Sequence, residues 1–279
     1  MTTASTPATS PAQPGTLPQR DTIRLLLERS SRPNRTVPIR REFLQKGPKG
    51  TPTPGQLCEL VRKSQPRALD LYLLVSAVTS GGDFDVTEWA TTWARSVGNY
   101  DETAGPTTVS RAWKALLNLK LIERKRGEKG KATIIKLRED GSDTPYTPPS
   151  SSGGDPYFQL PYEYWDHSLN ESLSLPGKAM LLITLSQRKE RFTLPQDRMP
   201  SWYGISADTA GRGLTELQDK GVLAHVEDEP FDTLKTRTGL ASRPVYSLLA
   251  PFTPRGLGYA TPRSGSTADG HSNVQSKAS

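Results

Sequence analysis

The sequence contains only one cysteine and three histidines in 279 residues, and the histidines are widely separated. A single cysteine, Cys58, cannot form an intramolecular disulfide, and His167, His225 and His271 lack the spacing typical of a metal site. We expect Cys58 to pack as a small hydrophobic residue. The composition therefore predicts neither a disulfide framework nor a bound metal or other cofactor.

Long hydrophobic runs are also missing. The most apolar stretches, residues 69–78 and 179–185, are far shorter than the roughly 20 residues that a membrane-spanning helix needs. The N-terminus does not combine a charged start with an apolar core, the pattern typical of a secretion signal. We expect a soluble cytoplasmic protein without membrane contact.

The motifs of common catalytic sites are absent as well. The sequence has no paired-histidine motif, no glycine-rich phosphate loop and no nucleophile elbow. Residues 162–167, YEYWDH, gather reactive groups, but no second cluster completes a site, and we expect an edge strand or a packing segment. The sequence therefore predicts a protein that is not an enzyme.

Composition divides the chain into six segments. Residues 1–20 and 251–279 are rich in Ser, Thr, Pro, Gly and Ala, and we expect disordered tails because so few large apolar groups cannot offset the entropy of ordering. Residues 141–155 have the Pro, Gly and Ser content of a linker. They separate a predicted domain at 60–140 from a second at 156–250.

Residues 21–59 form a further segment that is rich in cations. Residues 21–28 predict a short helix, and RPNRTVPIRR predicts an extended arm, because each proline disfavours helix at the preceding residue. Two interpretations stay open: an arm in a DNA minor groove, or a strap packed on the first domain with its arginines in solvent. On the first interpretation, the arm would contact DNA through Arg32, Arg35, Arg40 and Arg41.

Residues 107–119 predict a helix with two unlike faces. Its apolar stripe has the spacing of a core-facing surface: Val109, Ala112, Trp113, Leu116 and Leu117. The opposite face carries hydroxyl, amide and cationic groups of the kinds that reach base edges or phosphates. From this face we predict five residues in the major groove: Thr107, Thr108, Ser110, Arg111 and Lys114.

Two predicted strands follow this helix, at 121–126 and 131–137, and glycines permit a tight turn between them. We call residues 121–137 the basic hairpin. Between Thr107 and Arg138 there are ten cations and two anions, a net charge of +8, whereas the whole chain carries +7. A local surplus of this size indicates a phosphate-binding patch, for which the hairpin supplies Arg124, Arg126, Lys129 and Lys131.

Two further helices are predicted ahead of this region. Residues 67–79 are apolar on most sides and predict a buried first helix. Asp85 and Glu88 have capping-box spacing and predict the start of a second helix. We expect Trp89 and Trp93 of that helix to lie in the core.

The second domain repeats the same plan. DTAGRGLTEL at 208–217 aligns with residues 107–116 at a constant offset of 101, so that Thr108 corresponds to Thr209 and Arg111 to Arg212. Residues 177–187 and 194–204 predict its first two helices, and residues 222–227 and 244–249 a hairpin around a long loop. Thr209 and Arg212 are therefore candidate DNA contacts of this domain.

The segments TTVSRAWKALLNLKLIERKR and DTAGRGLTELQDKGVL resemble the recognition helix and first wing of bacterial winged-helix DNA-binding regulators, and the tandem arrangement is similar to plasmid replication initiators. The resemblance implies a fold of the mainly α type with small β-hairpins (α+β), made of two winged-helix domains. It also implies binding to double-stranded DNA, a location at the nucleoid, and sequence reading by helix 107–119. We expect a transcriptional regulator. The alternatives are a plasmid or mobile-element replication initiation or partition protein and a protein-interaction adaptor.

The two domains differ in charge. Residues 155–250 hold ten cations and thirteen anions, a net charge of −3, which disfavours contact with phosphates. This leaves two roles for the second domain: a weaker DNA contact on an adjacent half-site, or an interface for a homodimer or another protein partner. We favour the second role.

Overall fold

The structure is a computed structural model of the whole chain. It describes residues 17–253 except for residues 31, 49, 102–103, 128–130 and 151–154. Most of the two predicted tails therefore lies outside the described residues. Helices and small antiparallel sheets alternate along the chain, so the prediction of a mixed α and β protein is confirmed.

The first domain, which we call the first unit, begins with a buried helix. Its elements in chain order are α3 (Pro66–Val78), β4 (Asp85–Glu88), α4 (Ala90–Ser96), α5 (Ala104–Asn118), β5 (Ile122–Arg126) and β6 (Ala132–Lys136). The three strands form one antiparallel sheet in the order β4-β6-β5. The helices predicted near 67–79 and 107–119 and the basic hairpin are thus confirmed.

The predicted capping box is wrong. Asp85 and Glu88 are the ends of strand β4, which pairs with β6 from Ile135 to Ala132. Helix α4 begins after Trp89, which has extended backbone angles and provides no side-chain cap. Pairing across the sheet overrides the local helix signal, because β6 runs alongside all four residues and offers partners for the backbone groups that face it.

The second unit has the same element order. It consists of α8 (Leu175–Leu185), β8 (Arg191–Thr193), the 3-10 helix η3 (Gln196–Arg198), α9 (Met199–Tyr203), α10 (Ala207–Asp219), β9 (Leu223–Asp232) and β10 (Leu240–Leu248). Its sheet order, β8-β10-β9, matches that of the first unit. The strands of the second hairpin are longer than predicted, since pairing continues from Leu223 to Asp232 and replaces much of the expected loop.

Residues 17–62 form a strap that joins the two units. It contains α1 (Gln19–Arg29), β1 (Thr36–Arg40), the 3-10 helix η1 (Arg41–Phe43), β2 (Gln45–Lys46), β3 (Thr53–Pro54) and α2 (Leu57–Arg62). Strand β1 pairs with β7 (Tyr157–Pro161), which leads into the second unit, and the pairing is centred on Pro38 and Gln159. The predicted helix and extended segment are present, and the extended segment is a strand that bridges the units.

The segment 162–167 was expected to be an edge strand or a packing segment. It is helical, since α6 (Glu163–Asp166) and α7 (Leu169–Ser172) follow β7 directly. Tyr162, Tyr164 and Trp165 are buried, and the two tyrosine rings each meet the Trp165 ring edge-on. The segment therefore packs against the core, and of the two predicted alternatives the packing segment is correct and the edge strand is wrong.

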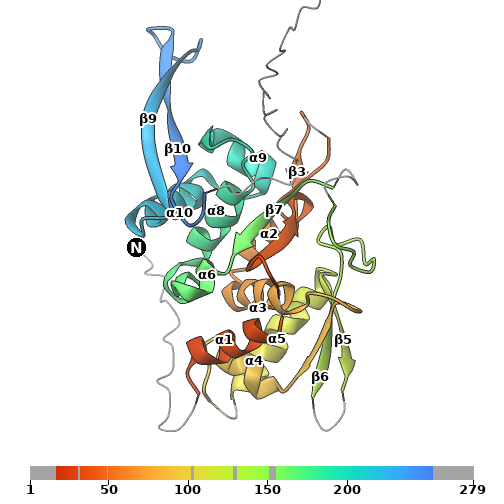
Figure 1. Cartoon of the computed structure of the whole chain (residues 1–279). Coiled ribbons are helices and arrows are strands. Elements are labelled where there is room, and N and C mark those ends of the chain that lie inside the picture. Colours follow the sequence, from red (N-terminus) through yellow and green to blue (C-terminus); the bar gives the residue numbers. More distant parts are fainter. Residues whose placement is uncertain are drawn as a thin grey trace, which may run out of the picture.

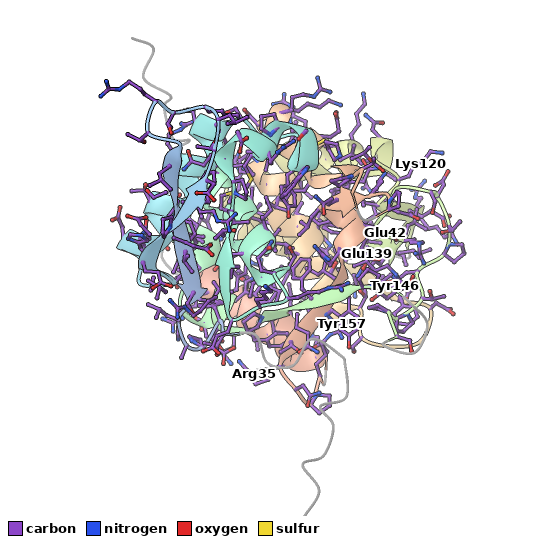
Figure 2. The ribbon with its side chains drawn as sticks, turned by 90° about the horizontal axis from the view of Figure 1, so that it is seen from above. Arg35, Glu42, Lys120, Glu139, Tyr146 and Tyr157 are labelled. Atoms are coloured by element: carbon purple, nitrogen blue, oxygen red, sulfur yellow. The ribbon has the colours of Figure 1, made fainter. Side chains whose placement is uncertain are left out.

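Residues of the predicted linker, 141–155, contact other parts of the protein, whereas the sequence predicted a loose connection. Tyr146 is buried, and the Thr147 carbonyl accepts a hydrogen bond of 2.7 Å from Arg40. Asp155 pairs with Arg40 and Arg138. Figure 2 labels Glu139, Tyr146 and Glu42 of the strap in the same part of the molecule. Partners from other parts of the chain therefore hold described residues of this segment, and its local composition does not reveal these contacts.

One contiguous cluster of buried apolar residues runs through the strap and both units. Figure 1 shows the first unit at one end of the molecule and the second unit at the other, with the β5–β6 and β9–β10 hairpins extending from opposite ends. Strand β7 crosses between them. The shared core and the β1–β7 pairing fix the two units relative to each other.

Candidate nucleic-acid interface

Helix α5 places its apolar residues against α3 and α4. Val109, Ala112, Trp113 and Leu116 are buried, and the Trp113 ring meets the Trp93 ring of α4 edge-on at 5.4 Å between centroids. This geometry is favourable for aromatic pairs and fixes how α5 crosses α4. Leu117, which was expected in the same stripe, is exposed, because it lies at the margin of the apolar face.

The opposite face of α5 is open to solvent. Thr107, Ser110, Arg111 and Lys114 are exposed, and Thr108 is half-buried, where its hydroxyl accepts a hydrogen bond of 3.2 Å from Asn99. Among the residues that the structure describes, neither Arg111 nor Lys114 has an ion-pair partner. The cationic groups of this face are therefore available to an external anion.

The basic hairpin continues this exposed positive surface. Arg124 and Arg126 on β5 are exposed, and no carboxylate within the described ranges pairs with either of them. Lys131 is half-buried, and its ammonium lies 5.4 Å from the centre of the Trp89 ring. Lys129 lies outside the described residues.

Two cations that the sequence count assigned to this patch are held by carboxylates of the protein. Lys136 is 1% exposed and pairs with Glu139 at 3.1 Å, while the Tyr146 ring centre lies 3.8 Å from its ammonium. Burial lowers the pKa of Lys136, and Glu139 partly opposes that shift. Arg138 is held by Glu42, Asp140 and Asp155. The external patch is thus smaller than the net charge of +8 suggests.

Arg32 and Arg35, two of the arginines proposed for a DNA-binding arm, contact the protein. Arg32 donates to the carbonyl oxygens of Ala77, Ser76 and Thr79 at the end of α3. Arg35 remains partly exposed, pairs with Asp166 at 2.7 Å and lies over the Tyr162 ring. Carbonyl groups at a helix end lack partners in the helix, so Arg32 stabilises this end.

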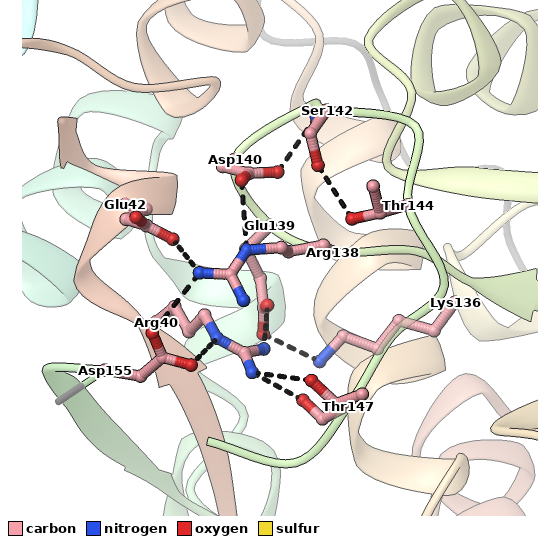
Figure 3. A network of polar contacts seen from close by, with 10 residues as sticks. All are labelled: Arg40, Glu42, Lys136, Arg138, Glu139, Asp140, Ser142, Thr144, Thr147 and Asp155. Atoms are coloured by element: carbon pink, nitrogen blue, oxygen red, sulfur yellow. Dashed lines mark hydrogen bonds and ion pairs between the residues drawn. The ribbon is translucent and has the colours of Figure 1, made fainter. Parts of the chain in front are cut away.

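Arg40 is the arm residue for which the DNA-contact hypothesis is wrong, because its side chain is 1% exposed and bonded to Glu139, Asp155 and Thr147. Figure 3 shows this network, in which Glu139 lies between Arg40 and Lys136. The backbone N–H of Arg41 donates to the Pro156 carbonyl, which ties this residue to the segment before β7. The strap interpretation therefore holds for the backbone of residues 32–41, which packs on the protein, but its expectation of arginines in solvent is wrong for Arg32 and Arg40.

The corresponding helix of the second unit is arranged differently. In α10, Arg212 forms an ion pair of 3.1 Å with Asp208, one turn earlier, and its guanidinium also lies 3.5 Å from the Thr209 hydroxyl. The N–H of Thr209 donates to the Ser206 side chain, which caps the helix. The Arg212 charge is thus partly neutralised within its own helix.

Three further cations of the second unit also lie near carboxylates. Arg191 pairs with Glu227, and Arg243 pairs with Glu229 at 2.9 Å. Lys235 lies 3.9 Å from Asp197. Together with α10, these pairs give the second unit a surface without a concentrated positive charge.

Sequence reasoning misassigned Trp89, which was expected in the core. Its side chain is 44% exposed, whereas Trp93 is buried as predicted. The prediction rested on the spacing of Trp89 and Trp93, which places two residues on one helix face only when both belong to the helix. Trp89 precedes α4, so this spacing does not apply to it.

No protein-family model matches this sequence, and a search of curated proteins finds no match. Within the described part of the chain, His, Cys, Asp and Glu side chains do not form a group of three or more that could hold a metal ion. None of the described helices has the length and apolar character needed to cross a membrane.

Proposed function

We propose that the protein is a sequence-specific double-stranded DNA-binding protein built from two tandem winged-helix units. The order helix, strand, helix, helix, strand, strand occurs in both units, and in both sheets the last strand lies between the other two. This arrangement resembles a winged helix, in which the third helix enters the major groove and the hairpin lies beside it.

The observation that carries the proposal is the exposed cationic face formed by α5 and β5. Arg111 and Lys114 on the helix and Arg124 and Arg126 on the strand are exposed. A guanidinium at the helix surface donates to both acceptors of a guanine, whereas hairpin cations neutralise phosphates of any sequence. The first unit therefore supplies both sequence reading and affinity, and the protein acts as a transcriptional regulator.

Selection of bound duplexes from a random pool tests this proposal. The full chain is expected to enrich one motif, and Arg111→Ala is expected to lose discrimination at one base pair, at a cost of about 1–3 kcal/mol. Arg212→Ala is the matched control, since Arg212 occupies the corresponding position in α10 and pairs with Asp208. An Arg111→Ala protein that weakens on selected and random duplexes alike would show that α5 is not the reading helix.

A second candidate is initiation or partition at repeated sites on a plasmid or mobile element. It is favoured by the β1–β7 pairing and the buried Arg40–Glu139 pair, which hold the two units in one fixed arrangement. A rigid pair of units suits two half-sites at a constant separation. Footprinting distinguishes the candidates: protection of two adjacent helical turns by one chain favours the initiator, and protection of a single turn favours reading by the first unit alone.

A further inference from the structure

Trp89 is an exposed indole on a molecule that buries most of its tryptophans. Trp93, Trp113 and Trp165 are buried, and Trp202 is half-buried. Leaving so large an apolar ring in water forgoes a substantial gain from burial. Its exposure therefore calls for a physical explanation from its surroundings.

The surroundings of Trp89 are the end of the first unit's sheet next to the turn of the basic hairpin. Glu88 and Arg126 both pair with Ala132, from β4 and β5, so Trp89 follows the last paired residue of β4. Lys131 immediately precedes β6 and places its ammonium over the indole at 5.4 Å. Three strands thus end at the same end of the sheet, where Lys131 lies over the Trp89 ring and Arg126 lies on the far strand, β5.

Among the described residues near Trp89, Glu88 does not balance the charge of Lys131. Glu88 is turned inward, with its side chain 10% exposed, and pairs with Arg29 of α1. Lys131 and Arg126 have no carboxylate partner among the residues that the structure describes. The Trp89 ring and the Lys131 ammonium, which has no carboxylate partner among the described residues, present apolar area and positive charge together.

We propose that Trp89 and Lys131 form a further DNA contact, in which the indole packs on a deoxyribose and the ammonium binds an adjacent phosphate. The sugar-phosphate backbone combines an apolar surface with an anion, which matches this pair of side chains. The contact lies beside the hairpin and positions the duplex without reading its sequence. This inference rests on the proposed function, because it extends the surface formed by α5 and β5.

The test compares the full-length protein with Trp89→Ala and Trp89→Phe on the selected duplex and on a random duplex. Trp89→Ala is expected to weaken binding to both by roughly five- to twentyfold, the range of one aromatic contact, and to leave the salt slope unchanged. Lys131→Ala is expected to reduce the slope of log K against log salt by about one. Trp202→Phe, in the second unit, is the matched control and is expected to bind like the wild type.

Fluorescence provides a readout that is independent of affinity. Trp89 is the most accessible indole in the described part of the chain, so duplex DNA should shield it from acrylamide, and this protection should be missing in Trp89→Phe. If the wild type binds and Arg111→Ala impairs discrimination while Trp89→Ala binds normally, this inference is overturned and the proposed function stands. If the wild type does not bind duplex DNA, both are overturned.

Discussion

Arg40 and Glu139 form an ion pair of 2.8 Å although they are 99 residues apart in the sequence, and their side chains are 1% and 0% exposed. Glu139 also accepts a hydrogen bond from Lys136 of β6, and Arg40 belongs to the strand that pairs with β7. The basic hairpin of the first unit is therefore connected, through one buried carboxylate, to the strand that joins the two units.

Glu139→Gln is expected to destabilise the protein strongly. The substitution leaves two buried cations without a full counter-charge, and breaking a buried pair from one side costs about 3–5 kcal/mol. Urea unfolding measures the change in the free energy of unfolding. Glu28→Gln is the control, because Glu28 pairs with Arg24 on the surface, and it should leave the unfolding midpoint unchanged. Equal effects of the two substitutions would show that the network is not a stabilising element.

Acid is expected to weaken the same region. Burial by itself raises the pKa of Asp155, but hydrogen bonds and charge from Arg138 and Arg40 outweigh it, and the net pKa lies below the usual value. A carboxylate with a depressed folded-state pKa stabilises the protein above the unfolded value, and this contribution is lost as the pH falls below about 4.

In urea unfolding between pH 6 and pH 3, Asp155→Asn should therefore show a shallower loss of stability than the wild type. The exposed Asp83 provides the control, and Asp83→Asn should follow the wild-type pH dependence. A wild-type pH dependence in Asp155→Asn as well would contradict the proposed role of the ion pairs.

Much of the interface was predictable from sequence, because α5 is governed by local rules. Its 3.6-residue periodicity placed Trp113 inside and Arg111 outside, and both positions agree with the structure. The basic hairpin was predictable for the same reason, since alternation and glycines act over a few residues. The repeat at an offset of 101 then extended these predictions to α10.

The remaining features depend on distant partners. Strand β4 has only four residues and is stabilised by β6, almost 50 positions later, so its local pattern suggested a helix start instead. Lys136 was counted as a surface cation because the sequence does not show that it is buried with Glu139. That burial depends on Arg40 of the strap, which pairs with Glu139 in the folded protein. Such pairings follow from tertiary contacts, which neither composition nor periodicity encodes.

Two glycines of α10 are expected to respond to alanine with opposite signs. A Cβ at Gly213 would lie 2.5 Å from the Pro176 carbonyl oxygen, where α10 packs against α8, so Gly213→Ala should destabilise the protein. The nearest atom to a Cβ at Gly211 is 3.9 Å away, and Gly211→Ala should stabilise the helix by about 0.5–1 kcal/mol. Thermal unfolding compares the two variants, and stabilisation by both would show that the helices can separate without cost.

The hairpin cations are expected to control affinity rather than specificity. Arg124→Ala and Arg126→Ala should each reduce the slope of log K against log salt by about one, because each removes one phosphate contact. Arg243→Ala, on β10 of the second unit, is the control, since that arginine pairs with Glu229. A loss of base discrimination in the β5 variants, with an unchanged salt slope, would reverse the roles given to the helix and the hairpin.

The second unit is expected to gain DNA binding when the acidic residue at the start of α10 is removed. Asp208 occupies the position that corresponds to Thr107, and it holds Arg212 at 3.1 Å while adding a negative charge at the start of α10. A helix N-terminus otherwise attracts phosphate, so the aspartate suppresses DNA contact by both effects. Asp208→Thr should release Arg212, strengthen binding to duplex DNA and steepen the salt slope by about one.

Asp219→Thr is the matched control for this prediction, because it makes the same change in charge at the other end of α10. It should raise affinity far less than Asp208→Thr, since removing a charge from the helix C-terminus does not expose Arg212. An equal gain in both variants would mean that net charge alone limits binding. No gain in either would indicate that α10 faces away from the duplex, which leaves the second unit free to bind another protein.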